Sequence, residues 1–266
     1  MMKTNKRSKM WQLIFSYFII ITCAQAFLNN TPSAIETDIT YDIYVSEIGN
    51  ITSIQEGIDA AQKNDTIFIE NGIYHENIVI DKPITLIGEN KTQTIIDGRN
   101  AGNTIKINAE NVTIKQLTIQ HSGIYFPNAG INLSTSYAII ENIILKNNFY
   151  GITLFNAQHN SIQNNMIQDN DQCGIYMSYS SNNYFSNNTI TNHTYNGFGL
   201  YGASNNNIIQ NNTLTKNGYC AVNIRSSSMN TIIGNNISNN NIGIHVRSKE
   251  NNIKQNTFSN NNKNYD

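Results

Sequence analysis

The sequence predicts an all-β chain folded as a right-handed parallel β-helix of about eight or nine coils, with an N-terminal capping helix. A repeat of roughly 23 residues runs through the second half of the chain, and a period of that size is typical of solenoids. The repeat reads N-x-I-x-x-N-x-I, then a few polar residues, then G-I-x-L. The 48 asparagines stand in fixed phase with isoleucine and leucine, which favours an ordered stack over a disordered asparagine-rich tract.

The first 26 residues have the composition of a secretory signal peptide. A basic start between Lys3 and Lys9 precedes the apolar run Trp11–Cys23, and residues 24–26 read as an A-x-A cleavage site. The run is short for a membrane span, although an uncleaved anchor is the alternative. No later apolar stretch approaches the length of a span. We therefore expect a secreted, periplasmic or cell-surface protein whose mature chain has no stable membrane span.

Two further segments follow in the predicted organisation. Residues 27–45 form a spacer that leads into the first strand, and residues 46–266 form the β-helix domain. Residues 53–63 are expected to be one short helix, because Ser53 and Glu56 form a capping box ahead of an amphipathic stretch. A solenoid exposes its apolar core at its end, so we assign this helix to capping that end.

Short strands rich in isoleucine and threonine follow the helix, each bounded by Gly, Asn or Asp. They are expected at residues 66–69, 77–80, 84–87, 94–96, 104–107, 112–114 and 117–119, and the phased pattern begins near residue 137. Each repeat supplies three strands that make one triangular coil, and the coils stack in parallel at about 4.8 Å. Isoleucine and leucine then point inward, while asparagines at the corners tolerate left-handed backbone and hydrogen-bond along the stack.

Two cysteines follow the predicted cleavage site. Cys173 and Cys220 each precede the G-I-x-L strand of their own repeat, and Asn196 takes the equivalent place in the repeat between them. Two coil steps separate the thiols by about 10 Å, whereas a disulfide needs Cα atoms within roughly 7 Å. The spacing predicts two free cysteines in spite of export.

The repeats from about Ile51 to Phe258 resemble the parallel β-helix repeat proteins of the pectin-lyase-like class, and among them the NosD-type periplasmic β-helix domain. Gly72-x-Tyr74-x-Glu76, followed by I-D-K-P-I-T-L-I-G, is also similar to the opening of pectinesterases. The pectinesterase signatures D-F-I-F-G and L-G-R-P-W do not occur in the sequence. The resemblance therefore implies the fold but does not imply esterase activity.

The NosD-type resemblance implies a role in the copper maturation of nitrous oxide reductase. Copper sites favour clusters of His, Met or Cys. The histidines are His75, His121, His159, His193 and His245. None of them has another kind of metal-ligating residue two or four positions further along the chain. Met166, Met177 and Met229 show no M-x-x-M spacing. The sequence predicts no metal site and no cofactor, and copper delivery is the second alternative function.

On the G-I-x-L strand, alternate positions point away from the core. Coil by coil, the outward pairs are Thr153/Phe155, Tyr176/Ser178, Gly199/Tyr201, Asn223/Arg225 and His245/Arg247. Stacking would place them in one strip about 20 Å long. Aromatic faces and arginine forks suit sugar rings and uronic carboxylates, so the candidate binding residues are Tyr176, Tyr201, Arg225, His245 and Arg247. Alternatively, these side chains have no binding role and are ordinary exposed residues of a β-sheet, in which aromatic residues are common.

Carboxylates are scarce in the repeats, and glycoside hydrolysis normally needs two. Asp169 and Asp171 share one turn and are the candidate catalytic pair of the enzyme alternative, a polysaccharide hydrolase or lyase. The position of the pair favours an ordinary turn feature over a catalytic one. A net charge of -1 excludes a generic nucleic-acid partner. The sequence thus favours a non-enzymatic module that binds a polysaccharide or cell-surface glycan through the exposed strand face.

Overall fold

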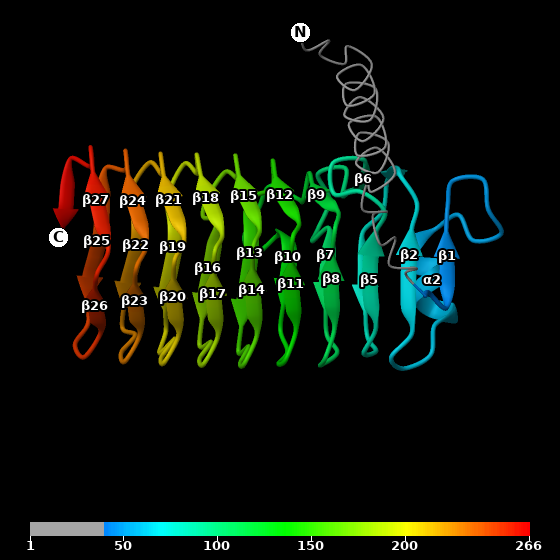
Figure 1. The fold of residues 1–266 in the computed structure, drawn as a ribbon, viewed down its shortest axis with the longest axis horizontal. Helices are drawn as coiled ribbons and strands as arrows, with labels where there is room; N and C mark the ends of the chain where they lie inside the picture. Colours follow the sequence, from blue (N-terminus) through cyan, green and yellow to red (C-terminus); the bar gives the residue numbers. More distant parts are fainter. Residues whose placement is uncertain (1–39) are drawn as a thin grey trace, which may run out of the picture. The chain divides into compact units, whose positions relative to one another are not determined.

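The computed structural model describes residues 40–266, and the predicted signal peptide lies outside the described residues. These residues form a right-handed parallel β-helix built from three sheets, A, B and C, as Figure 1 shows. Sheet A has 10 strands and the other two have 9 each, so the solenoid has about ten turns. The predicted fold class is confirmed. The number of coils is slightly higher than expected, because the early coils lack the phased asparagines that mark the later ones.

From β2 onward, the chain visits the three sheets in the order A, B, C in each coil, whereas β1 and β2 both belong to sheet A. Sheet A contains β1 (Ile43–Val45), β2 (Thr66–Ile69), β5 (Thr85–Gly88), β8 (Thr113–Lys115), β11 (Ile139–Glu141), β14 (Ser161–Gln163), β17 (Tyr184–Ser186), β20 (Ile208–Gln210), β23 (Thr231–Ile233) and β26 (Asn252–Lys254). Sheet B contains β3 (Gly72–Tyr74), β6 (Thr94–Asp97), β9 (Thr118–Gln120), β12 (Ile144–Lys146), β15 (Met166–Gln168), β18 (Thr189–Thr191), β21 (Thr213–Thr215), β24 (Asn236–Ser238) and β27 (Thr257–Ser259). Sheet C contains β4 (Ile78–Ile80), β7 (Ile105–Ile107), β10 (Ala129–Leu133), β13 (Tyr150–Phe155), β16 (Ile175–Ser178), β19 (Asn196–Tyr201), β22 (Cys220–Arg225), β25 (Ile242–Arg247) and β28 (Lys263–Tyr265).

The single described helix, α2 (Ile54–Ala60), lies at the N-terminal end of the stack beside β1 (Figure 1). The Ser53 side chain accepts a hydrogen bond from the Glu56 N–H, as the capping box predicts. Glu76 provides the carboxylate at the helix start, since it accepts bonds from Ser53 and from two backbone N–H groups of the first turn. The helix is shorter than expected because Ala61 is already extended. The first strand, β1, precedes the helix and pairs with β2.

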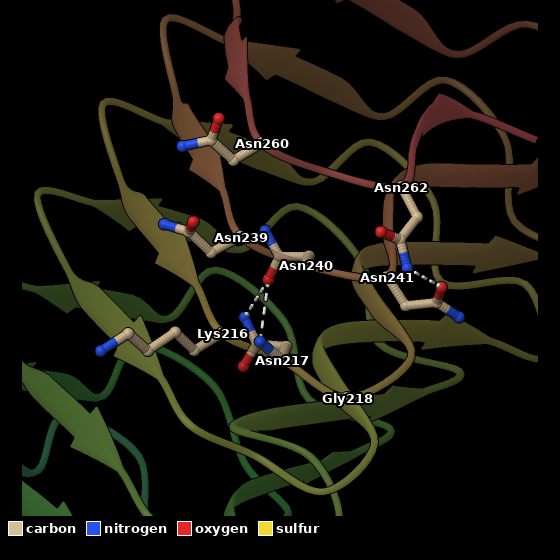
Figure 2. Close-up of a pocket in the computed structure, with 8 residues that line it drawn as sticks. All are labelled: Lys216, Asn217, Gly218, Asn239, Asn240, Asn241, Asn260 and Asn262. Carbon is tan, nitrogen blue, oxygen red and sulfur yellow. Dashed lines mark hydrogen bonds between the residues drawn. The ribbon is translucent and has the colours of Figure 1, made fainter.

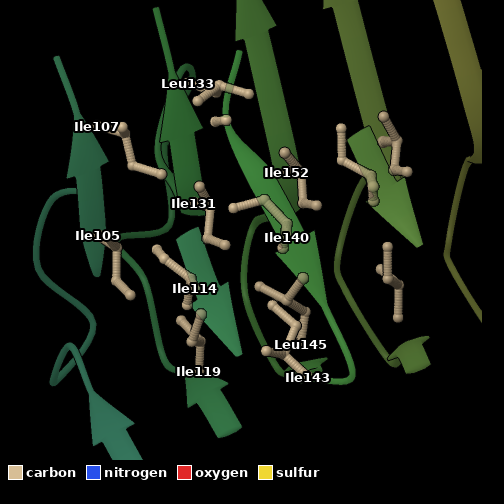
Figure 3. Packing of buried hydrophobic residues seen from close by; sticks show 14 of the residues in the cluster. Ile105, Ile107, Ile114, Ile119, Ile131, Leu133, Ile140, Ile143, Leu145 and Ile152 are labelled. Carbon is tan, nitrogen blue, oxygen red and sulfur yellow. The ribbon is translucent and has the colours of Figure 1, made fainter. Parts of the chain in front are cut away.

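The interior is a continuous stack of aliphatic side chains, and Figure 3 shows part of it in the middle coils. In sheet C the register aligns Ile152 with Ile175, Ile175 with Phe198, and Phe198 with Val222. All four side chains are fully buried. The inward assignment of the second position of G-I-x-L is therefore confirmed, and each coil covers the apolar side chains of the next.

Each corner in the repeat region is made by two consecutive residues with different tasks. The first adopts left-handed backbone, as at Asn164, Asn187 and Asn211, with φ of 57°, 55° and 54°. Asparagine is common there because it tolerates this conformation, but Lys216 takes the same place with a φ of 55°. The second residue is buried and extends its side chain along the solenoid axis.

Three ladders made mostly of asparagine side chains run along the axis, one at each corner. At the C-to-A corner the rungs are Asn160, Asn183, Asn207, Asn230 and Asn251. This corner also carries a shorter ladder of Ser180, Ser204 and Ser227. At the A-to-B corner the rungs are Asn165, Asn188, Asn212, Asn235 and Asn256. At the B-to-C corner they are Asn148, Asn170, His193, Asn217, Asn240 and Asn261. This third ladder is interrupted after His193, because Asn217 Oδ1 has no partner in the described residues. The rungs are buried, except the last one of each asparagine ladder, which is half-buried.

A single rung shows what the ladders do. Asn183 Oδ1 accepts from both the backbone N–H and the side-chain amide of Asn160, each at 3.0 Å. Its own Nδ2 donates to the Ala157 carbonyl at 3.0 Å and to Asn207 Oδ1 at 3.1 Å. The rung thus satisfies a buried backbone N–H that the turn would otherwise leave without a partner.

His193 replaces asparagine in the B-to-C ladder and performs the same task. Its Nδ1 accepts from the Asn170 N–H at 3.2 Å, and its Nε2 lies 3.2 Å from the Ile167 carbonyl, to which it donates. This arrangement requires the neutral ring. Burial lowers the pKa of His193 from 6.5 to about 4.

We expect Asn183→Gly to destabilise the protein much more than Asn182→Gly. The first change leaves the buried Asn160 N–H unsatisfied, at about 1–3 kcal/mol. The second falls on an exposed residue with a φ of 59°, where glycine is free of strain. Urea unfolding of both variants measures the difference. Equal losses of unfolding free energy would contradict the ladder.

We expect His193 to make the protein less stable in acid. Because its pKa is lower when folded, the unfolded chain binds the extra proton below about pH 6.5, and stability is lost as the pH falls from there toward 4. The loss from this residue reaches about 3 kcal/mol at pH 4. His193→Asn restores the common ladder residue, so the variant should lose less stability between pH 7 and 4.5. Identical pH profiles of the melting temperature in the two proteins would refute this role.

Candidate functional site

The outer face of sheet C from β13 to β25, called here the sheet C face, carries the side chains predicted to form the strip. The strand register puts them in columns along the solenoid axis. One column runs Thr153, Tyr176, Gly199, Asn223 and His245. A second contains Phe155, Ser178, Tyr201, Arg225 and Arg247. The five candidate binding residues therefore share one face, at successive coils.

The sheet C face is more buried than its outward direction suggests. Asn223 and His245 are only 1% and 2% exposed, Tyr201 and Arg225 are half-buried, and Arg247 is exposed. Tyr201 and Arg225 point away from the core, as their positions predict, but neighbouring side chains cover part of both. Tyr201 lies back over Gly199, where a Cβ atom would come within 2.6 Å of the Tyr201 ring. Its hydroxyl accepts hydrogen bonds from the amides of Asn196 and Asn223, both at 3.2 Å.

Aromatic rings cover the N-terminal half of the face. Tyr176 stacks on Tyr201 with ring centroids 5.1 Å apart and lies 5.8 Å from Phe155. Phe126, from the segment between β9 and β10, packs edge-on against Tyr176, Phe155 and Tyr150 at 6.0–6.2 Å. Phe126 could not be predicted as part of this face, because no repeat determines the path of that segment. Together these rings form an apolar platform with exposed edges, since Phe126 is 58% exposed.

The C-terminal half of the face is polar, and several of its buried atoms have no partner in the described residues. They are Asn196 Oδ1, Asn223 Oδ1, Arg225 Nε and His245 Nε2. Most buried polar groups in proteins are hydrogen-bonded, so such a group of exceptions on one face needs an explanation. Asn196 was not predicted as a site residue, although its position at the start of β19, between the two cysteine rungs, put it on this face.

His245 is oriented by a carboxylate that the sequence analysis also missed. Its Nδ1 lies 2.8 Å from Asp266 Oδ2, and Lys263 donates to the other oxygen of Asp266 at 3.1 Å. The hydrogen bonds from Lys263 and His245 lower the pKa of Asp266. With Nδ1 bonded to the carboxylate, Nε2 is the ring nitrogen that borders the face.

The two cysteines begin strands of the same sheet, and Cys173 lies beneath the aromatic platform. Cys173 packs with Tyr150 and Tyr176, and Asn196 stands between the two cysteine rungs. Both thiols are free, as predicted. Burial raises the pKa of Cys173 to about 11 and that of Cys220 to about 12, so both stay protonated near neutral pH.

The candidate catalytic pair lies at the B-to-C corner, outside the columns of the sheet C face. Asp169 has left-handed backbone with a φ of 54°, and its carboxylate accepts from the amides of Gln168 and Asn192. Asp171 is exposed. Asp169 is therefore engaged in corner hydrogen bonds, and the catalytic role of the pair stays a hypothesis.

The same corner carries an amide-lined hollow further toward the C-terminus (Figure 2). Its volume is about 620 Å³, and it is lined by Lys216, Asn217, Gly218, Asn239, Asn240, Asn241, Asn260 and Asn262. Asn217 and Asn240 are rungs of the ladder and are hydrogen-bonded to each other at 2.9 Å. The hollow is thus a product of the corner geometry, and it has no aromatic lining.

Comparison with known proteins identifies the family. Residues 56–266 match the NosD family, described as "Periplasmic copper-binding protein". The chain belongs to the NosD family. A search of curated proteins found no match. Across residues 40–266, no helix is long and apolar enough to cross a membrane.

Solved structures similar to this NosD-family chain share its fold. The Azotobacter vinelandii mannuronan C-5 epimerase A-module has a TM-score of 0.59 and 17% identity, with 81% of this chain and 77% of that chain covered. A GH87 alpha-1,3-glucanase catalytic domain in complex with nigerose has a TM-score of 0.69 and 18% identity, covering 84% of this chain but only 46% of that one. A pectin methylesterase in complex with a hexasaccharide has a TM-score of 0.51 and 15% identity, covering 75% and 80%.

The described residues do not fit a copper centre of the kind that the family description implies. Within residues 40–266, no three His, Cys, Asp or Glu side chains come together as a ligand set. The histidines are used separately: His193 in a ladder, His121 with Asp97, and His245 with Asp266. The cysteines are two rungs apart and protonated.

We expect both thiols to be inert in the folded protein. Because the thiolate is the reactive form, modification of Cys173 and Cys220 by an aromatic disulfide reagent at pH 8 should be at least about a hundredfold slower than for a free cysteine. Both should react once the protein is unfolded in urea, which serves as the control. Rapid labelling of the native protein, or a mass showing a bond between them, would contradict the buried rungs.

Proposed function

We propose that the protein binds a polysaccharide segment along the sheet C face, as a glycan-binding module. The single observation that carries the proposal is the arrangement of this face. An aromatic platform adjoins a polar region whose buried hydrogen-bonding atoms have no partner within residues 40–266. Sugars present both surfaces that such a face needs, namely C–H faces that pack on rings and hydroxyl groups that donate and accept.

The dimensions of the face suit an extended chain. Five strands, from β13 to β25, span about 20 Å at the ordinary strand spacing. Each step along the axis presents a new side chain in the same column. A linear oligosaccharide lying along the axis would therefore meet one column position after another.

Tyr201 stands at the boundary of the two halves and would take part in binding. Its ring stacks on Tyr176, and its hydroxyl holds the amides of Asn196 and Asn223. A ligand that supplied hydroxyl groups to those amides would compete with the Tyr201 hydroxyl. Binding would then be accompanied by a rotation of this side chain off Gly199.

The similar structures support this proposal at the level of the fold. The epimerase, the glucanase and the methylesterase are carbohydrate-active by their descriptions, and two are in complex with oligosaccharides. The alternative, a polysaccharide hydrolase or lyase using Asp169 and Asp171, has less support, because Asp169 is held by corner hydrogen bonds and lies off the face.

The test is binding of purified protein to a glycan array, followed by calorimetry with the best oligosaccharide. We expect Tyr176→Leu to weaken binding by about tenfold, because it removes the ring that the sugar packs on while keeping apolar volume. Tyr184→Leu is the matched control, since Tyr184 is a half-buried tyrosine of β17, the next strand along the chain, on sheet A. Equal affinities of the two variants would remove the sheet C face as the site.

The same samples separate binding from catalysis. The Asp169→Asn, Asp171→Asn double variant should bind as well as the wild type. Cleavage of the polysaccharide by the wild type, lost in this double variant, would replace the module by an enzyme.

A further inference from the structure

Two arginines lie side by side at the polar end of the sheet C face. Arg225 and Arg247 are partners in the register of β22 and β25. Like charges directly opposite each other in a sheet destabilise it, and they are normally offset by a nearby opposite charge. Within residues 40–266, the ion pairs are His121–Asp97, His245–Asp266 and Lys263–Asp266, so neither arginine is paired.

The surroundings of the pair are short of negative charge. Asp266 is the carboxylate nearest along the columns, and both of its oxygens are engaged, one by His245 and one by Lys263. The charge of Arg225 also acts on Tyr201 and Cys220, opposing the burial that raises the pKa of both groups. The polar end of the face is therefore cationic, although the whole chain carries a net charge of -1.

The Arg225 side chain is positioned to bind a ligand. Its Nε is buried and has no acceptor, and beside it Asn223 is buried with an unpartnered Oδ1. Asn223 and His245 are register partners, so the unpartnered Nε2 of His245 borders the same place. These atoms offer a guanidinium fork for an anion, with Asn223 Oδ1 and His245 Nε2 available to the hydroxyl groups next to it.

We propose that Arg225 and Arg247 bind a carboxylate, so that the ligand of the sheet C face is an acidic glycan that contains uronic acid. This inference rests on the proposed glycan-binding function and names its substrate class. Arginine presents parallel N–H donors that match the two oxygens of a carboxylate, and a carboxylate between the two guanidinium groups removes their mutual repulsion. The aromatic platform would then pack on the neighbouring sugar rings of the same chain.

The first experiment compares two ligands that have the same sugar backbone, oligogalacturonate and its fully methyl-esterified form. Their affinities are measured by calorimetry at low salt. The wild type should bind the acid about tenfold more tightly or better, and the preference should fall with added salt. The double variant Arg225→Gln, Arg247→Gln should lose the preference and bind both forms as the wild type binds the ester. The charge-matched control is Arg99→Gln, Lys115→Gln, because Arg99 lies between β6 and β7 and Lys115 ends β8, away from these coils.

A second arm tests the anion site without a polymer. In NMR spectra of the protein labelled with ¹⁵N, galacturonic acid at millimolar concentration should shift the Arg225 Nε–H signal, and galactose should not. A shift without any binding of oligosaccharides would refute the glycan function and keep the carboxylate site. No shift with galacturonic acid, or a wild type that binds the acid and the ester equally, would overturn the inference even if neutral glycans bind.

Discussion

The hydrogen bond from a backbone N–H at a corner to the buried side chain of the next coil is the interaction on which the rest of this structure depends. Each left-handed corner turns the chain but leaves an N–H group facing the interior, and Asn183 shows how a side chain from the next coil accepts it. Because the acceptor must come from the equivalent position of the next coil, the ladders fix the register of all three sheets. The apolar stack and the outer columns both follow from that register.

The sheet C face uses this register for a different purpose. Of the five buried side-chain atoms that have no partner within residues 40–266, four lie on this face, on Asn196, Asn223, Arg225 and His245, and the fifth is Asn217 Oδ1 in the B-to-C ladder. Local departures from full satisfaction are expected at functional sites, where stability is given up for binding. The rigid coils on either side hold these groups in place, so a ligand would meet a largely preformed surface.

The repeat was sufficient to predict the fold, the inward isoleucines and the first two ladders from the sequence. The third ladder could also have been predicted, because its residues follow the asparagines of the second ladder by five positions. It was missed, and His193 interrupts its row of asparagines. The columns of the face followed from spacing. Their burial did not, because the Tyr201 ring covers Gly199 through a choice of side-chain conformation. Phe126 comes from a segment outside the phased repeat, so no spacing could bring it to the face. Asp266 was within reach of the pattern, because it follows His245 by the same 21 residues that separate Asn240 from Asn261.

The most direct measurement is a crystal structure of the protein with a bound oligosaccharide selected from the array. The account predicts a sugar chain along the axis over β16, β19, β22 and β25, with a ring against Tyr176 and polar contacts to Asn223 and Arg225. It also predicts that the Tyr201 side chain has left Gly199. A saccharide bound on sheet A or sheet B, or in the amide-lined hollow at Lys216 and Asn239, would contradict the account.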